Sequence, residues 1–176
     1  MKYMIWAMES EIQRAVYVEE VSVSELRGKK VLDRESSRPP VLRPKKVNVI
    51  TGCNGSFKTT FLEALTVGLY MSSLNTLNSR HIMNLASTLR MDNLWFYFLA
   101  KDGFELTING YRVGSASDDE LLKAVFPLPN PSVYPSVKPV GFKLVKGDRV
   151  VRVLRVDLQP VPSGINISLV DSLLDR

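Results

Sequence analysis

The predicted fold is decided by one stretch, Val47-Asn48-Val49-Ile50-Thr51-Gly52-Cys53-Asn54-Gly55-Ser56-Phe57-Lys58-Thr59-Thr60-Phe61-Leu62. It opens with a β-branched run, 47–51, which is typical of a strand. A loop of small residues, 52–57, follows, and then a helical sequence that extends to Met71. Apolar residues surround most of the circumference of that helix, as in helices buried against a sheet. The order predicts a parallel strand, a tight loop and a buried helix.

The loop differs by one residue from the phosphate-binding motif Gly-x-x-x-x-Gly-Lys-[Ser/Thr], because Phe57 stands at the second glycine. Small residues let successive backbone N–H groups turn inward, and the helix start adds its positive dipole end. Lys58 is then expected to reach the β- and γ-phosphates, and the Thr59 hydroxyl to bind Mg²⁺. A turn that merely caps a core helix is the alternative interpretation. The expected nucleotide-binding residues are Asn54, Gly55, Ser56, Phe57, Lys58, Thr59 and Thr60.

The rest of the chain is predicted to be rich in antiparallel strands. Upstream, alternating valines between 16 and 23 predict a half-buried strand, and 28–46 predicts a loop or irregular hairpin. Downstream, Leu94–Leu99, 104–108 and 111–113 predict a three-stranded meander, whose second turn is Asn109-Gly110.

Further along, Ser117-Asp118-Asp119-Glu120 has the spacing of a helix capping box. Prolines crowd 127–139, and residues 140–158 predict a second hairpin. We expect short helices at 4–15, 81–90 and 166–176. The whole chain, 1–176, is predicted to be one domain with two parts, 16–72 and the β-rich 94–158.

Composition excludes several classes of protein. With 45% hydrophobic and 23% charged residues in 176, the chain is too well balanced for global disorder. It holds no apolar run long enough to span a bilayer and no secretory signal, so we expect a cytoplasmic protein. One cysteine, Cys53, and one histidine, His81, argue against disulfides, zinc sites and a Ser-His-Asp triad.

The net charge of +5 fits a protein that meets polyanions, although a solvated basic rim is the better interpretation of it. The basic residues concentrate in three places. These are Arg27, Lys29, Lys30 and Arg34; then Arg38, Arg43, Lys45 and Lys46; and finally Arg149, Arg152 and Arg155.

Residues 47–65 resemble the Walker A region of ABC-type ATPases, specifically the SMC/RecF branch of chromosome maintenance and DNA repair. In that branch Asn-Gly-Ser-Gly-Lys-[Ser/Thr] is followed closely by Leu-Glu-Ala, as in Leu62-Glu63-Ala64 here. The segment 17–23 is similar to its opening strand, and 106–113 to a hairpin of its first lobe. The resemblance implies a P-loop NTPase-like α/β fold, an ABC-type N-terminal lobe with an antiparallel β subdomain.

Two family motifs are missing. The sequence has no Gly-Gly pair for a signature motif, and the nearest Walker B candidate, 153–158, contains Arg155 and ends in Leu158 instead of glutamate. That candidate is better interpreted as an ordinary amphipathic strand. Gln159, which lies 101 residues after Lys58, is the candidate for the glutamine that the family places at the metal.

The resemblance implies binding of Mg²⁺ and ATP, or another nucleoside triphosphate, by the first lobe of an SMC/RecF-like ATPase. Hydrolysis then depends on a second polypeptide that supplies the Walker B and signature motifs, and DNA and a second copy of the chain are further candidate partners. The alternative is a non-hydrolysing protein or nucleic-acid interaction module that keeps a vestigial loop.

Overall fold

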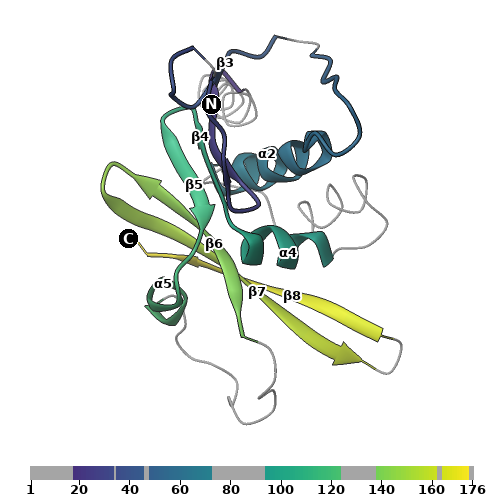
Figure 1. Ribbon diagram of the computed structural model, residues 1–176. Helices are drawn as coiled ribbons and strands as arrows, with labels where there is room; N and C mark the ends of the chain where they lie inside the picture. The colour runs from purple at the N-terminus through teal and green to yellow at the C-terminus, as the bar shows by residue number, and fades with distance from the viewer. Residues whose placement is uncertain are drawn as a thin grey trace, which may run out of the picture.

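The computed structural model describes residues 18–33, 35–45, 48–72, 94–123, 138–161 and 164–174. Three helices and eight strands lie within these ranges (Figure 1). In chain order they are β1 (Val21–Leu26), β2 (Lys29–Lys30), β3 (Val41–Leu42), α2 (Lys58–Ser72), α4 (Leu94–Asp102), β4 (Phe104–Ile108), β5 (Tyr111–Ser115), α5 (Asp118–Lys123), β6 (Val140–Lys146), β7 (Arg149–Val161) and β8 (Gly164–Leu173).

The strands form one sheet in the order β2-β1-β4-β5-β6-β7-β8, with β3 also paired to β1. Every strand pair is antiparallel. The two expected parts of the chain, 16–72 and 94–158, therefore share one sheet. Strand β1 of the first part pairs with β4 of the second, from Val21↔Ile108 to Leu26↔Phe104. The chain is a mixed α/β protein that consists mostly of strands.

Helices α2 and α4 pack on one face of this sheet and form the main core with it (Figure 1). The ring of Phe142 in β6 contacts Phe96 of α4 and Phe104 of β4 at centroid distances of 6.3 and 5.6 Å. Gly68 lets α2 approach β4, because a Cβ there would lie 2.9 Å from Leu106 Cδ1. Burial of these apolar side chains is the dominant favourable contribution to folding.

The short helix α5 lies on the opposite face. Neighbouring residues of a strand point to opposite faces, and Gly141 precedes the core residue Phe142. A Cβ at Gly141 would lie 2.7 Å from Leu121 of α5, so α5 covers the face that α2 and α4 leave open. The capping box forms as predicted: Ser117 N–H donates to Glu120 Oε2 at 2.7 Å, and Glu120 N–H donates to Ser117 Oγ at 3.4 Å.

An arginine fixes the C-terminal end of α2 to the last two strands. Arg152 of β7 is only 5% exposed, and its Nη1 donates to the carbonyl oxygens of Tyr70 and Met71 at 3.0 and 3.1 Å. Its Nε donates to Asp171 Oδ1 of β8 at 2.9 Å. The last carbonyls of a helix have no intrahelical partner, and a cation there also complements the helix dipole. Arg152 thus belongs to the core and not to a solvated rim.

Three sequence predictions are wrong. The first is the parallel strand at 47–51: residues 48–51 belong to no strand, and all pairing in the sheet is antiparallel. A β-branched run forms a strand only where another strand offers its backbone groups. In the described part of the chain, the neighbouring edge of β1 is taken by β2 and β3.

The second is the strand at 94–99, which is the helix α4. Its buried residues are Trp95, Phe96, Leu99 and Ala100, and Phe98 between them is 46% exposed. That spacing is helical, so packing against the sheet overrides the β propensity of the aromatic residues. The predicted meander is therefore reduced to a hairpin, β4–β5, and β1 takes the place beside β4.

The third is the helix at 166–176. Residues 164–173 form β8, which pairs with β7 over ten consecutive residues, from Val161↔Gly164 to Arg152↔Leu173. Pairing with the long strand β7 makes this segment a strand, since its local sequence is also compatible with a helix.

Other predictions are confirmed. The helix begins at Lys58, and the turn Asn109-Gly110 has positive φ values of 48° and 81°, as a tight two-residue hairpin requires. The hairpin β6–β7 forms, and the 153–158 candidate lies inside β7 as an ordinary strand. The expected helices at 4–15 and 81–90 lie outside the described residues, as does the proline-rich segment 127–139 apart from its last two residues, which belong to no helix or strand.

Candidate phosphate-binding loop

The loop 52–57 leads from the stretch 48–51 to the start of α2. The Ser56 N–H donates to the Cys53 carbonyl oxygen at 3.2 Å and so closes a turn. Inside this turn Gly55 has a φ of 81°, a conformation that costs glycine little. Nearly the whole loop is exposed, so a solute can reach it.

The side chain of Lys58 folds back over the loop. Its Nζ lies 2.7 Å from the carbonyl oxygens of Gly52 and Cys53 and 3.3 Å from Ser56 Oγ. Gly52 is needed for this arrangement, because a Cβ there would come within 2.6 Å of Ser56 Oγ. Lys58, the cation predicted to bind phosphate, is thus held against the backbone of the loop.

The amide groups at the start of α2 remain available. The first backbone bond into the helix runs from Phe61 N–H to the Phe57 carbonyl oxygen at 2.8 Å. Among the described residues, no protein group accepts a hydrogen bond from the amides of Lys58, Thr59 or Thr60. Unpaired N–H groups at a helix start, together with the helix dipole, favour an anion.

Phe57 has a backbone conformation that is typical of glycine. Its φ is 60°, in the left-handed region that residues with a side chain rarely occupy. The ring is half-buried, packs against the main core, and lies 5.6 Å from Lys29 Nζ of β2. The ring therefore lies on the side of the loop that contacts the core and β2. The loop keeps the glycine-type backbone that close approach to phosphates requires.

We expect Phe57→Gly to be more stable than Phe57→Ala by about 1 kcal/mol, because only glycine occupies positive φ without strain. At an ordinary position the order is reversed, since glycine loses more backbone entropy on folding. Both variants lose the packing of the ring, so the difference between their free energies of unfolding reports the backbone strain alone. Urea unfolding measures the two free energies, and an alanine variant equal to or more stable than the glycine variant would contradict the left-handed conformation.

The two residues predicted to bind a metal, Thr59 and Gln159, lie on different elements. Thr59 is the second residue of α2 and is exposed. Gln159 lies in β7 opposite Asn166, and Figure 1 places that end of β7 well away from the start of α2. In the described ranges no group of three or more His, Cys, Asp or Glu residues could hold a metal ion. The structure does not bring Gln159 to the loop.

Two features near the loop were missed by sequence reasoning. The first is Lys29 of β2, whose Nζ approaches the Phe57 ring. The second is Glu63 of α2, which is fully buried and faces Arg27: the Arg27 Nη2 atom lies 3.8 Å from the Glu63 Oε2 atom. Arg27 also lies 3.7 Å from Asp102 at the end of α4. The β1–β2 turn is thereby attached to both helices. The sequence signal was the basic cluster at 27–30, but only the sheet shows what it contacts.

Comparisons with protein-family models, with curated proteins and with solved structures found no match. Within the described residues, no helix has both the length and the apolar character needed to cross a membrane.

Proposed function

We propose that this protein binds a nucleoside triphosphate, with ATP and Mg²⁺ as the expected pair, through the loop 52–57 and the start of α2. The observation that supports this best is Phe57, which holds a glycine-type φ of 60° at the position where the phosphate-binding motif needs glycine. A residue with a side chain in this region of φ carries a backbone cost of about 1–3 kcal/mol, so its presence at the motif position supports a loop whose backbone is kept in the glycine-type conformation.

In this proposal the residues that bind the nucleotide are 54–60. The amides of the loop and helix start receive the phosphates, and Lys58 leaves the carbonyl oxygens of Gly52 and Cys53 to reach the β- and γ-phosphates. Thr59 holds Mg²⁺, which would neutralise charge on the phosphate oxygens.

The fold that we propose is the N-terminal lobe of an SMC/RecF-like ABC-type ATPase with a degenerate Walker A motif. The chain itself lacks the Walker B and signature motifs, so hydrolysis requires a second polypeptide that carries them. A role in DNA maintenance follows from the same resemblance.

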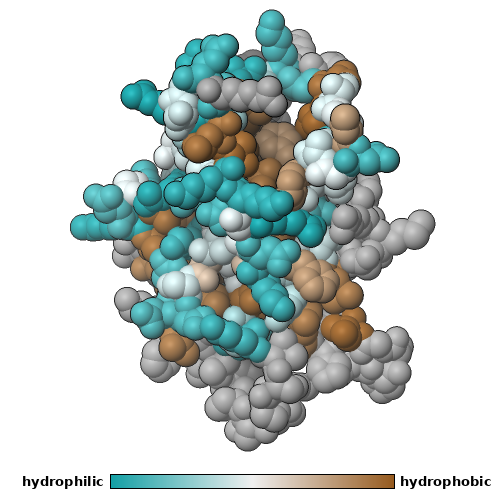
Figure 2. Space-filling view, viewed as in Figure 1, coloured by the Kyte–Doolittle hydropathy of each residue, from teal (hydrophilic) through white to brown (hydrophobic). Residues whose placement is uncertain are grey.

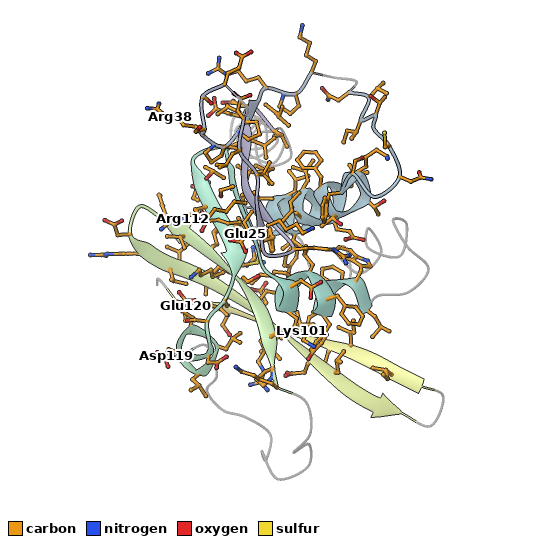
Figure 3. All side chains as sticks on the ribbon, in the orientation of Figure 1. Glu25, Arg38, Lys101, Arg112, Asp119 and Glu120 are labelled. Atoms are coloured by element: carbon orange, nitrogen blue, oxygen red, sulfur yellow. The ribbon has the colours of Figure 1, made fainter. Side chains whose placement is uncertain are left out.

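Thermal unfolding with and without Mg-ATP tests nucleotide binding. At a ligand concentration 100-fold above Kd, we expect a stabilisation of about 2.7 kcal/mol and a corresponding rise in Tm. Lys58→Ala should abolish the rise. Lys101→Ala is the matched control, because Lys101 is an exposed lysine on α4 that Figure 3 shows at the end of that helix.

The control should keep the full shift. Absence of any shift at millimolar Mg-ATP, or an equal shift in the Lys58→Ala variant, would contradict the proposal. In the first case the alternative, an interaction module with a vestigial loop, is the better account.

A further inference from the structure

The last strand of the sheet, β8, has one open edge. It pairs with β7 on one side, and no other strand of the described ranges pairs with it on the second side. The Leu174 N–H donates to the Val151 carbonyl oxygen at 2.9 Å, on the side of β7. Backbone groups of successive residues point to opposite edges of a strand, and the β7–β8 pairing runs without a register shift. The N–H and C=O groups of Leu169, Asp171 and Leu173 therefore point to the open edge.

Strand β8 lacks the features that usually protect an open edge. Its ten residues contain no proline, lysine or arginine, and the only charged side chain among them is Asp171. Proteins commonly prevent an edge from pairing with another chain by charged residues, prolines, bulges or a short edge strand. The edge of β8 is long, regular and almost uncharged, so it favours pairing with a further strand.

The charge of Asp171 is compensated within the chain. Arg152 Nε donates to Asp171 Oδ1 at 2.9 Å, and the Tyr70 hydroxyl donates to Asp171 Oδ2 at 2.8 Å. Because Tyr70 belongs to α2, these bonds also place the Asp171 side chain on the face of the sheet that α2 covers. An incoming strand therefore meets no uncompensated charge along this edge.

Apolar side chains are exposed at both ends of β8. Alternate residues of a strand share one face, so Ile165 and Leu173 lie on the same face as Asp171. Ile165 is 59% exposed and Leu173 52%, while Leu169 between them is partly buried against the main core. Exposed apolar residues that gather on one element mark an interaction site more often than single ones do.

The tip of the β7–β8 hairpin extends beyond the neighbouring strand. Pairing between β6 and β7 ends at Val140↔Val156, whereas β7 and β8 pair as far as Val161↔Gly164. Figure 1 shows this end of the hairpin extending from the sheet, and Figure 2 shows apolar surface where α4 lies near it. A further strand can therefore reach the tip without meeting another strand of the described ranges.

We infer that β8 pairs with β8 of a second copy of the chain, antiparallel about a two-fold axis that passes beside Leu169, so that two sheets join into one. A two-fold contact is isologous, which means that the same patch serves both copies. In this register Ile165 lies opposite Leu173 of the second copy, and the backbone groups that point to the two open edges face each other. The exposed apolar ends of the two strands then cover each other.

The composition of the edge favours a second copy over other occupants. Residues 164–174 contain no Lys or Arg to bind the phosphates of nucleic acid. A strand of another protein would need to be uncharged, with apolar side chains at both ends of one face, and β8 itself has this pattern. Like charges do not face each other, because Asp171 lies opposite Ile167 of the second copy. The inference does not depend on nucleotide binding.

Sedimentation of the whole protein over a range of concentrations, without nucleotide, measures the dimer. We expect a monomer at low concentration and a dimer at high concentration. Hydrogen exchange locates the interface, because strand pairing protects the amides that donate across it. The amides of Leu169, Asp171 and Leu173 should exchange at least tenfold more slowly in the dimer than in the diluted monomer.

Charged variants test the register. Ile165→Glu and Leu173→Lys each change an exposed side chain, place a charge opposite an apolar residue, and should raise the dissociation constant of the dimer at least tenfold. The double variant should recover most of that loss, because the introduced carboxylate and ammonium groups lie opposite each other across the two-fold axis. Leu122→Lys is the matched control at a 69% exposed leucine of α5, and it should dimerise as the wild type does.

Three results would overturn the inference. One is a protein that remains a monomer at millimolar concentration. Another is a dimer that the single variants do not weaken, or that the double variant does not restore. The third is slow exchange of the Leu169 and Leu173 amides in the diluted monomer, since the edge would then be covered within one chain. None of these measurements involves Mg-ATP.

Discussion

Replacing Arg152 by alanine should lower the free energy of unfolding by about 3–5 kcal/mol, the usual cost of removing one partner from a buried ion pair. The variant leaves the carbonyl oxygens of Tyr70 and Met71 without their donor and Asp171 without its cation. It also removes the guanidinium that lies 4.6 Å from the Tyr70 ring centroid. Urea unfolding followed by circular dichroism measures the loss.

Arg155→Ala provides the control. Arg155 lies in the same strand and pairs with Asp157 at 2.8 Å, and among the described residues it makes no hydrogen bond or ion pair with α2. We expect a loss of about 1 kcal/mol or less, as for most pairs near the surface. Equal losses in the two variants would contradict the role of Arg152 as the attachment of α2.

The effect of Arg152→Ala should depend on pH. Burial acts to raise the pKa of Asp171, but the hydrogen bonds and charge of Arg152, with the bond from Tyr70, outweigh it and hold the pKa below its usual range. A carboxylate whose pKa is lowered by folding adds stability that is present above the unfolded pKa and is lost as pH falls through the folded value. The difference in free energy of unfolding between the wild type and Arg152→Ala should therefore become smaller in acid.

Gly141→Ala should cost about 2–3 kcal/mol, at the upper part of the range for overpacked sites. An alanine Cβ at this position would lie 2.5 Å from the Leu154 carbonyl oxygen and 2.7 Å from Leu121 Cδ2. The first of these contacts is with backbone of the paired strand β7, which cannot move without disturbing the sheet. The predicted loss is again measured by urea unfolding.

Gly68→Ala is the comparison, because a Cβ there meets only the flexible end of Leu106, at 2.9 Å. Alanine is also favoured over glycine in the middle of a helix by about 1 kcal/mol. The two effects should nearly cancel and leave stability close to that of the wild type. A Gly141→Ala variant as stable as Gly68→Ala would contradict the close approach of Leu154 and Leu121 to Gly141.

Elements with strong local signals were predictable. The capping box at Ser117, the turn at Asn109-Gly110 and the helix that begins at Lys58 each depend on contacts within a few residues. The same holds for the loop, where small residues and a nearby lysine specify a turn before a helix.

Elements whose form depends on distant partners were not predictable. The aromatic run 94–99 has β propensity but forms a helix over the sheet, and the tail 164–173 becomes a strand because β7 offers a partner along its whole length. At the candidate site the sequence indicated the loop residues but not Lys29, which the β1–β2 pairing brings to the Phe57 ring. Nor did it indicate that Arg152 is buried.

The sequence by itself determined the turn, the start of α2 and the turn residues of the loop, because local hydrogen bonds and backbone preferences act between near neighbours. Tertiary structure alone decided which β-rich segments pair, that Arg152 holds the end of α2, and that residues 48–51 remain without a strand. The physical reason is that a strand, unlike a helix, satisfies its backbone only through another segment, so its existence depends on a partner far away in the chain or outside it.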